Sequence, residues 1–327
     1  MEGHPHTDDA RAHVQRGARL HVNGDLAAAC REYQAAIDID ASSAVAWNNL
    51  GFARAQQGEL DEAIRLYEHA LEIDPARSMA HANLGLAHLA RGETIAALDG
   101  LRRAVQLDPR NTLALGNLGR LLLAIGQIDA AERTFRAALD VEPRSAQLRV
   151  ALGTVLAARR RFKDAEAEIR RALDDEPDHA AGWSQLGAIL FLNHDLGSAC
   201  EALRRALALT PEDCSTRHHL VLALLARGQR VAAEQELTRI LGFEPGHRAA
   251  LVDLAVLALA RADGATALAL LDRVEDEDAR VRFYRALAFD ACGRRDDSDA
   301  LLREVAGQGG KYADLASVEL TRRQRPS

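Results

Sequence analysis

Residues 46–75, AWNNLGFARAQQGELDEAIRLYEHALEIDP, decide the fold. The first half predicts a helix that ends near Gly58, because glycine supplies the backbone freedom that a tight turn needs. The second half carries apolar residues at helical spacing from Ala63 to Leu71, after acidic residues that the helix dipole favours in a first turn. Pro75 closes the segment, since proline lacks the amide hydrogen that continues a helix. The stretch therefore predicts one helical hairpin.

This hairpin recurs every 34 residues along the chain. The prolines that end it are Pro75, Pro109, Pro143, Pro177, Pro211 and Pro245. A glycine column runs through Gly17, Gly51, Gly85, Gly119, Gly153 and Gly187, and an alanine column through Ala29, Ala63, Ala97, Ala131, Ala165, Ala199, Ala233 and Ala267. A period of this length predicts a solenoid in which each hairpin packs on its neighbours. The glycine and alanine columns mark where the two helices of a hairpin approach closely.

The pattern of Trp47, Leu50, Gly51, Ala63, Tyr67, Ala70 and Pro75 resembles the tetratricopeptide repeat. The resemblance implies an all-α fold, a right-handed superhelical solenoid of helix-turn-helix repeats. We expect nine repeats, at 10–43, 44–77, 78–111, 112–145, 146–179, 180–213, 214–247, 248–278 and 279–312. Residues 1–9 are expected to be disordered. Residues 313–327 are expected to form a C-terminal capping helix and a solvated tail that includes Arg322, Arg323 and Arg325.

Composition indicates the cellular compartment and limits the classes of partner that we expect. The formal charge of −7 argues against a nucleic-acid partner, because phosphate binding needs a basic surface. The N-terminus has no apolar segment of the kind found in a secretory signal, and no run of 18 apolar residues predicts a membrane span. The four cysteines form no CxxC pair. These features favour a cytoplasmic protein, and the preference for arginine over lysine favours a bacterial one.

A column of amide side chains lies two residues before each glycine. It reads Gln15, Asn49, Asn83, Asn117, Ala151, Gln185, His219 and Asp253. In the tetratricopeptide family the first helices line the inside of the superhelix, where ligands are usually extended peptides. The column resembles the asparagine ladder in the superhelix of peptide O-linked N-acetylglucosamine transferases, in which an amide can hold a peptide backbone as both donor and acceptor. The alternative interpretation is that these amides bond neighbouring helices.

The expected peptide-binding site therefore lies on the first helices. Its residues are Asn48, Asn49, Phe52, Asn83, Leu86, Asn117, Arg120 and Gln185. Phe52 and Leu86 have the alternative of packing against a neighbouring helix. The family's carboxylate clamp for chaperone tails needs several basic residues on these helices, and only Arg11 and Arg120 come near, so such a receptor is disfavoured.

No pattern in the chain predicts catalysis. Cys214 and His218, with His219 beside them, have the spacing of a metal pair but no third ligand, so a packed thiol beside a surface imidazole is favoured. The fragment GQGGKY at 307–312 lacks the glycine spacing, the hydroxyl residue and the preceding strand of a phosphate loop. We expect no catalytic residues, no metal and no cofactor.

These observations predict a non-catalytic protein–protein interaction scaffold that binds an extended protein segment in a concave channel. A protein or peptide partner is expected, with neither nucleic acid nor membrane. One alternative is a substrate-recruiting partner of a separately encoded glycosyltransferase or other modifying enzyme. The other is a self-assembling structural protein that associates through its atypical terminal repeats.

Overall fold

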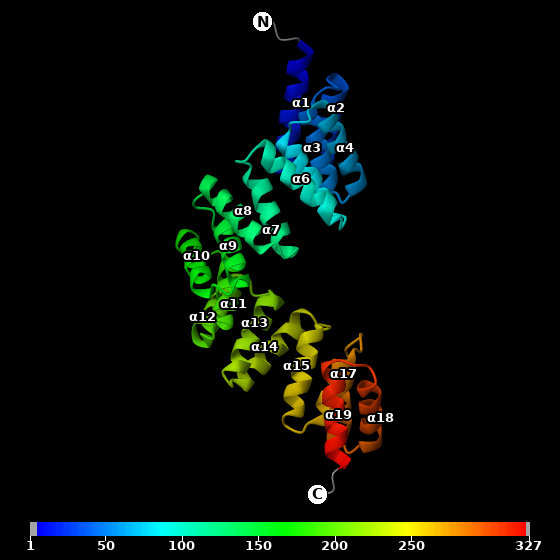
Figure 1. Ribbon diagram of the computed structural model, residues 1–327. Helices are drawn as coiled ribbons and strands as arrows, with labels where there is room; N and C mark the ends of the chain where they lie inside the picture. Colours follow the sequence, from blue (N-terminus) through cyan, green and yellow to red (C-terminus); the bar gives the residue numbers. More distant parts are fainter. Residues whose placement is uncertain (1–4, 325–327) are drawn as a thin grey trace. The chain divides into compact units, whose positions relative to one another are not determined.

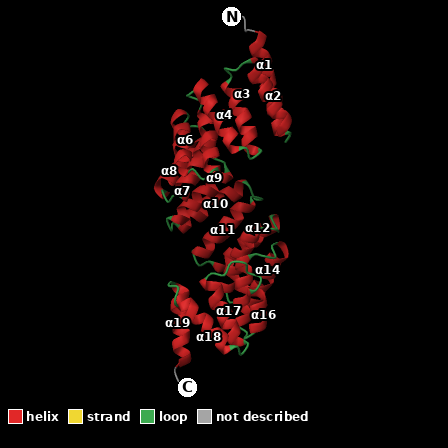
Figure 2. Cartoon of the chain, turned by 90° about the vertical axis from the view of Figure 1, so that its right-hand side faces the viewer, coloured by secondary structure: helices red, strands yellow, loops and turns green. Residues whose placement is uncertain are grey.

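The computed structural model describes residues 5–324, and within them every regular element is an α-helix (Figures 1 and 2). The chain divides into two compact units, Met1–Asp175 and Glu176–Ser327. Each unit is a row of helical hairpins in which every helix packs on the next one along the chain. The protein is therefore an all-α helical repeat solenoid, as the sequence predicts.

The first unit contains five hairpins within its described residues, coloured from dark blue to green in Figure 1. Its helices are α1 (Pro5–Val22), α2 (Leu26–Ile39), α3 (Ala44–Gln56), α4 (Leu60–Ile73), α5 (Ser78–Ala90), α6 (Thr94–Leu107), α7 (Thr112–Ala124), α8 (Ile128–Val141), α9 (Ala146–Ala158) and α10 (Phe162–Asp175). The first helices of successive hairpins also contact one another, from α1 with α3 to α7 with α9. They therefore form a continuous first-helix face within this unit.

The second unit contains four hairpins and one further helix within its described residues. Its helices are α11 (Ala180–Leu192), α12 (Leu196–Leu209), α13 (Cys214–Ala226), α14 (Arg230–Phe243), α15 (Arg248–Leu259), α16 (Gly264–Leu271), α17 (Ala279–Ala291), α18 (Arg295–Ala306) and α19 (Lys311–Gln324). The short helix α16 falls in the repeat that the sequence shows to have 31 residues instead of 34. Helix α19 packs on both α17 and α18 and so covers the last hairpin.

The glycine column lies where the two helices of a hairpin touch. A Cβ atom added to Gly119 would lie 2.7 Å from Cζ of Phe135, and one added to Gly51 would lie 3.2 Å from the carbonyl oxygen of Ala63. Phe135 and Ala63 are fully buried on the second helices of these hairpins. A larger residue in the glycine column would overpack this contact, which explains why small residues recur there.

The turn inside each hairpin needs a left-handed residue. Gly58 has a φ of 84° at this point. At the matching positions Arg160, His194 and Ala262 have φ values of 60°, 63° and 59°. Left-handed backbone costs roughly 1–2 kcal/mol for a residue with a Cβ atom. The hairpin geometry therefore persists even where the sequence does not supply a glycine.

A second column explains why tryptophan, histidine and arginine replace one another on the first helices. Trp47 Nε1 donates to the carbonyl of Ala41 at 2.9 Å, and Trp183 Nε1 donates to that of Pro177 at 2.8 Å. The same bond to the carbonyl six residues earlier is made by His81 at 3.0 Å, by Arg149 at 2.5 Å and by Arg217. Because the turn leaves that carbonyl without a helical partner, any long side chain with an N–H group can satisfy it.

The two ends differ from the expected order. Of the segment 1–9, the residues from Pro5 to Asp9 are helical and begin α1, where proline suits a first helical turn, and residues 1–4 lie outside the described residues. At the other end the side chain of Arg323 is only 8% exposed and pairs with Asp290, Asp299 and Glu319. The expectation of a solvated tail is therefore wrong for Arg323, while Arg325 lies outside the described residues.

Candidate peptide-binding groove on the first helices

Three of the expected site residues form a short chain of amides across two repeats. Asn83, on α5, is 6% exposed and donates from Nδ2 to Oδ1 of Asn48, on α3, at 3.0 Å. Asn48 is also buried and donates from Nδ2 to Oδ1 of Asn49 at 3.2 Å. The Asn83–Asn48 bond joins the first helices of neighbouring hairpins, as the alternative interpretation of the amide column expects, whereas the Asn48–Asn49 bond lies within α3.

The chain of amides is not closed at its ends. Asn49 is half-buried, and neither its Nδ2 nor Oδ1 of Asn83 has a hydrogen-bond partner within the described residues. One end therefore offers a donor and the other an acceptor. A peptide group presents the complementary pair.

An apolar groove lies beside these amides. A cavity of about 190 Å³ is lined by Phe52 and its neighbours at the end of α3, by Asn83 and Leu86 with further residues of α5, and by residues of α4. Phe52 remains 41% exposed, and its ring stacks on that of His21 from α1, with centroids 5.0 Å apart. The structure therefore brings Phe52, Asn83 and Leu86 together at one cavity, and it joins the buried Asn48 and the half-buried Asn49 to Asn83 through hydrogen bonds.

The remaining expected site residues are not part of this groove. Asn117, on α7, donates to the carbonyl of Leu113 in its own helix at 2.8 Å and accepts from Nη2 of Arg120 at 2.7 Å. Arg120 is exposed. Gln185 is half-buried on α11, in the second unit. The two amides that continue the column thus differ in surroundings from Asn83.

Several residues of the groove were absent from the expected site. His21 supplies the ring that stacks on Phe52, and Tyr67 and Leu60 close the groove from α4. Burial raises the pKa of the Tyr67 hydroxyl, so this residue stays neutral. The amide column does not include these residues, because Leu60 and Tyr67 lie on a second helix and His21 lies on a first helix but outside that column. Among them only Tyr67 has a sequence signal, because it is the aromatic residue of the second helix that faces Gly51 in the glycine column.

The same face of the second unit carries charge. His218 Nε2 lies 2.9 Å from Oδ2 of Asp253, and Arg280 donates from Nη2 to Oδ1 of Asp253 at 2.8 Å. Burial and the neighbouring His218 lower the pKa of His219. His218 stands in the column of Asn48, and Asp253 in that of Asn49 and Asn83, where the first unit has amides.

The thiol of Cys214 does not belong to a metal site in the described part of the chain. Cys214 is buried, and desolvation raises the pKa of its thiol, which disfavours the thiolate that binds metals. No group of three or more histidine, cysteine, aspartate and glutamate side chains in residues 5–324 could hold a metal ion. None of the helices described is both long enough and apolar enough to span a bilayer.

Two family models match this chain in sequence, and solved structures match it in fold. The family model of the cilia and flagella-associated protein 70 C-terminal domain matches residues 41–249, and a model of the tetratricopeptide repeat matches residues 17–58. A comparison with curated proteins finds no match.

Two solved structures share the fold at low sequence identity. A chain of the APC/C hetero-tetramer Cut9–Hcn1 superposes with a TM-score of 0.61 and 22% identity over 72% of this chain, which spans 46% of that one. PilF of Pseudomonas aeruginosa matches with a TM-score of 0.51 and 19% identity, over 77% of this chain and 99% of that one. At such identities the likeness shows the common fold alone.

Proposed function

We propose that this chain, a member of the tetratricopeptide-repeat family, is a non-catalytic scaffold whose groove on α3 and α5 binds an extended protein segment. The chain belongs to this family because the model of the cilia and flagella-associated protein 70 C-terminal domain matches more than half of it. Proteins with this fold are generally interaction scaffolds. The finer proposal concerns the place and the mode of binding, together with a cytoplasmic location.

The apolar groove beside an open amide pair carries this proposal. Phe52 and Leu86 offer a surface for one apolar side chain of a ligand, next to Asn83. Asn49 and Asn83 provide a donor and an acceptor for the ligand's backbone. A peptide in extended conformation presents backbone groups and side chains in alternation, so it can use both features at once.

The test replaces Leu86 with arginine. Arg120 occupies this column one repeat later, so the fold accepts an arginine there. The new charge should block the apolar groove and weaken binding at least tenfold, because an apolar side chain would be replaced by a cation that must stay hydrated. The measurement is fluorescence anisotropy with short peptides selected against the whole chain from a random displayed library.

The matched control is Leu222→Arg. Leu222 lies in the same column of the second unit, on α13, and is exposed, whereas Leu86 is half-buried. We expect Leu222→Arg to bind the selected peptides like the unmodified chain, with both variants keeping their helical circular-dichroism signal. Equal affinities for Leu86→Arg and the unmodified chain, or equal losses in the two variants, would contradict the proposal.

The two alternatives from the sequence predict different behaviour. A substrate-recruiting partner of a glycosyltransferase or other modifying enzyme would use the same groove, with the enzyme's substrate as its ligand. A self-assembling protein would instead associate through its terminal repeats, and light scattering would then show a mass that grows with concentration.

A further inference from the structure

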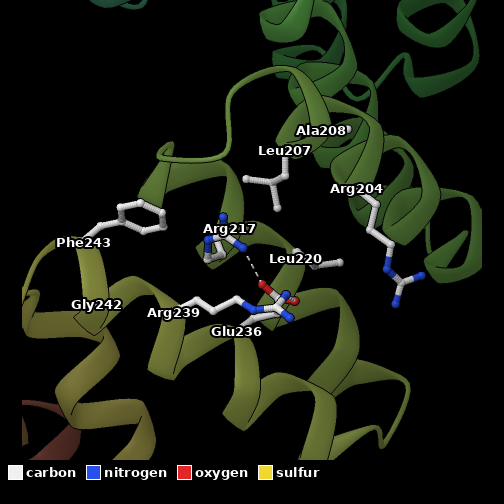
Figure 3. A pocket seen from close by; sticks show the side chains of 9 residues that line it. All are labelled: Arg204, Leu207, Ala208, Arg217, Leu220, Glu236, Arg239, Gly242 and Phe243. Carbon is white, nitrogen blue, oxygen red and sulfur yellow. Dashed lines mark hydrogen bonds and ion pairs between the residues drawn. The ribbon is translucent and has the colours of Figure 1, made fainter.

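A second cavity, of about 700 Å³, lies in the second unit. It is bounded by α12, α13 and α14 of the second unit (Figure 3). Its apolar wall is formed by Leu207, Leu220 and Phe243, and Phe243 is 52% exposed. A half-exposed phenyl ring beside an open cavity is a surface that a ligand can cover.

The floor of this cavity is a buried ion pair. Arg217 is 6% exposed, and its Nη1 lies 2.7 Å from Oε2 of Glu236 (Figure 3). Its guanidinium also donates to the carbonyl of Pro211 and lies 5.6 Å from the centre of the Phe243 ring. Arg217 is therefore held in place by Glu236 and the carbonyl of Pro211, with the ring of Phe243 beside it.

Two further arginines border the cavity. Arg239 is bound to Glu236 at 2.6 Å but is largely exposed, and Arg204 is exposed with no ion pair to any residue described. Figure 3 shows Arg204 and Phe243 on opposite sides of the cavity. The lining thus carries three cationic side chains and one carboxylate, Glu236.

The positions two repeats earlier provide an internal comparison. They keep the framework, because Arg149 pairs with Glu168 at 3.3 Å and Arg171 pairs with Glu168 at 2.9 Å. There Arg136 is neutralised by Glu132 at 2.9 Å, whereas the residue four before Arg204 is the buried Cys200.

The wall of the cavity also lacks acidic residues that are present at the matching positions of earlier repeats. Asp140, Asp174 and Asp175 stand where the cavity has Ala208, Gly242 and Phe243. Carboxylates around the framework have therefore been replaced by small and apolar groups. The matching positions two repeats earlier therefore carry a net negative charge, whereas the lining of the cavity carries a net positive one.

From this combination we infer that the cavity is a second binding site, for an acidic peptide segment of a partner protein. Carboxylates of the segment pair with Arg204 and Arg239, which can form charge-assisted hydrogen bonds. An apolar side chain of the same segment packs against Phe243 and Leu207. The site is independent of the groove on α3 and α5.

The test uses the whole chain and one defined probe, a fluorescein-labelled peptide of alternating glutamate and leucine, with the glutamine–leucine peptide as its uncharged counterpart. The acidic peptide should bind at least tenfold more tightly than the uncharged one, and added salt should weaken it. Arg204→Ala and the pair Gly242→Asp, Phe243→Asp should each reduce the affinity at least tenfold. The pair introduces residues that the fold already carries at the matching positions, Asp174 and Asp175.

The control is Arg205→Ala, which removes the neighbouring arginine that pairs with Asp178 instead of lining the cavity. Arg205→Ala and Leu86→Arg should both leave the affinity for the acidic peptide unchanged. The inference is overturned if the unmodified chain fails to bind the acidic peptide at millimolar concentration, if the uncharged peptide binds equally well, or if Arg204→Ala and Arg205→Ala behave alike. Circular dichroism of each variant shows that it is folded.

Discussion

The first-helix faces of the two units use one geometry for two kinds of chemistry. In the first unit Asn83 bonds to Asn48 at 3.0 Å, and in the second His218 bonds to Asp253 at 2.9 Å. Both pairs are 35 residues apart, and they occupy the same two columns of the repeat. The repeat therefore determines where a polar contact between neighbouring first helices lies, while the residue types decide whether that contact is neutral or ionisable.

This difference affects what each face can bind. The neutral pair lies beside the groove of Phe52 and Leu86, where uncharged amides suit a peptide backbone. The charged pair is completed by Arg280, which donates to Asp253. Asp253 is thus already occupied by two partners, and its face is built to hold α13, α15 and α17 together.

The largest effect is expected from removing the acceptor of the charged pair. Asp253→Ala leaves Arg280 and His218 without their carboxylate and should destabilise α15 by about 2–3 kcal/mol, since hydrogen bonds to charged groups are the stronger ones. Asn83→Ala removes one neutral bond and should destabilise α5 by about 1–2 kcal/mol. Native-state hydrogen exchange measures both, because it reports the opening of each helix separately.

Asp253→Asn provides the control for shape. It keeps the volume and one acceptor oxygen, so it should cost less than Asp253→Ala. A larger effect at Asn83 than at Asp253 would contradict the assignment of the stronger contact to the second unit.

The sequence predicts the fold in detail because the residues that determine the fold recur at the same positions of successive repeats. The glycine at Gly51, the alanine at Ala63 and the proline at Pro75 report backbone and packing constraints that every repeat shares. The groove is predicted in part, since Phe52 and Leu86 belong to such a column.

The columns do not predict contacts between side chains that stand at different positions of the repeat. The stacking of His21 on Phe52 joins α1 to α3, and the burial of Arg323 depends on carboxylates from α17, α18 and α19. No spacing rule within one repeat contains these pairs. The same holds for Asn83, whose partner Asn48 lies one residue away from the amide column itself.

The turns of the hairpins extend the comparison at a smaller scale. Each unit has both glycine and larger residues at this left-handed position: Gly58 and Arg160 in the first, Gly228 and Ala262 in the second, where Ala262 has a φ of 59°. Ala262→Gly should stabilise its hairpin by about 0.5–1 kcal/mol, because the relief of strain exceeds the entropy that glycine adds to the unfolded chain. Gly58→Ala should destabilise by a similar amount. Thermal melts of the two variants test this pair, and a destabilising Ala262→Gly would show that the turn is not strained.

The smallest effect concerns pH and is expected at the charged face. Burial and His218 lower the pKa of His219 below its usual 6.5, while Asp213 opposes this shift. The unfolded chain therefore takes up the proton first as the pH falls, so the stability that His219 contributes is complete above pH 6.5 and is lost below it. Because the ring is partly exposed, solvent screening keeps the loss well under about 1 kcal/mol.

His218, His247, Asp253 and Arg280 also lie in this region, so the informative quantity is a difference between variants. His219→Gln should flatten the dependence of the melting temperature on pH between 7.5 and 5.5 relative to the unmodified chain. His81→Gln, which alters a histidine of the first unit bound to a backbone carbonyl, is the control, and it should leave the contribution of His219 unchanged. If His219→Gln and the unmodified chain lose stability in parallel as the pH falls, the ionisable face of the second unit does not respond to pH through this residue.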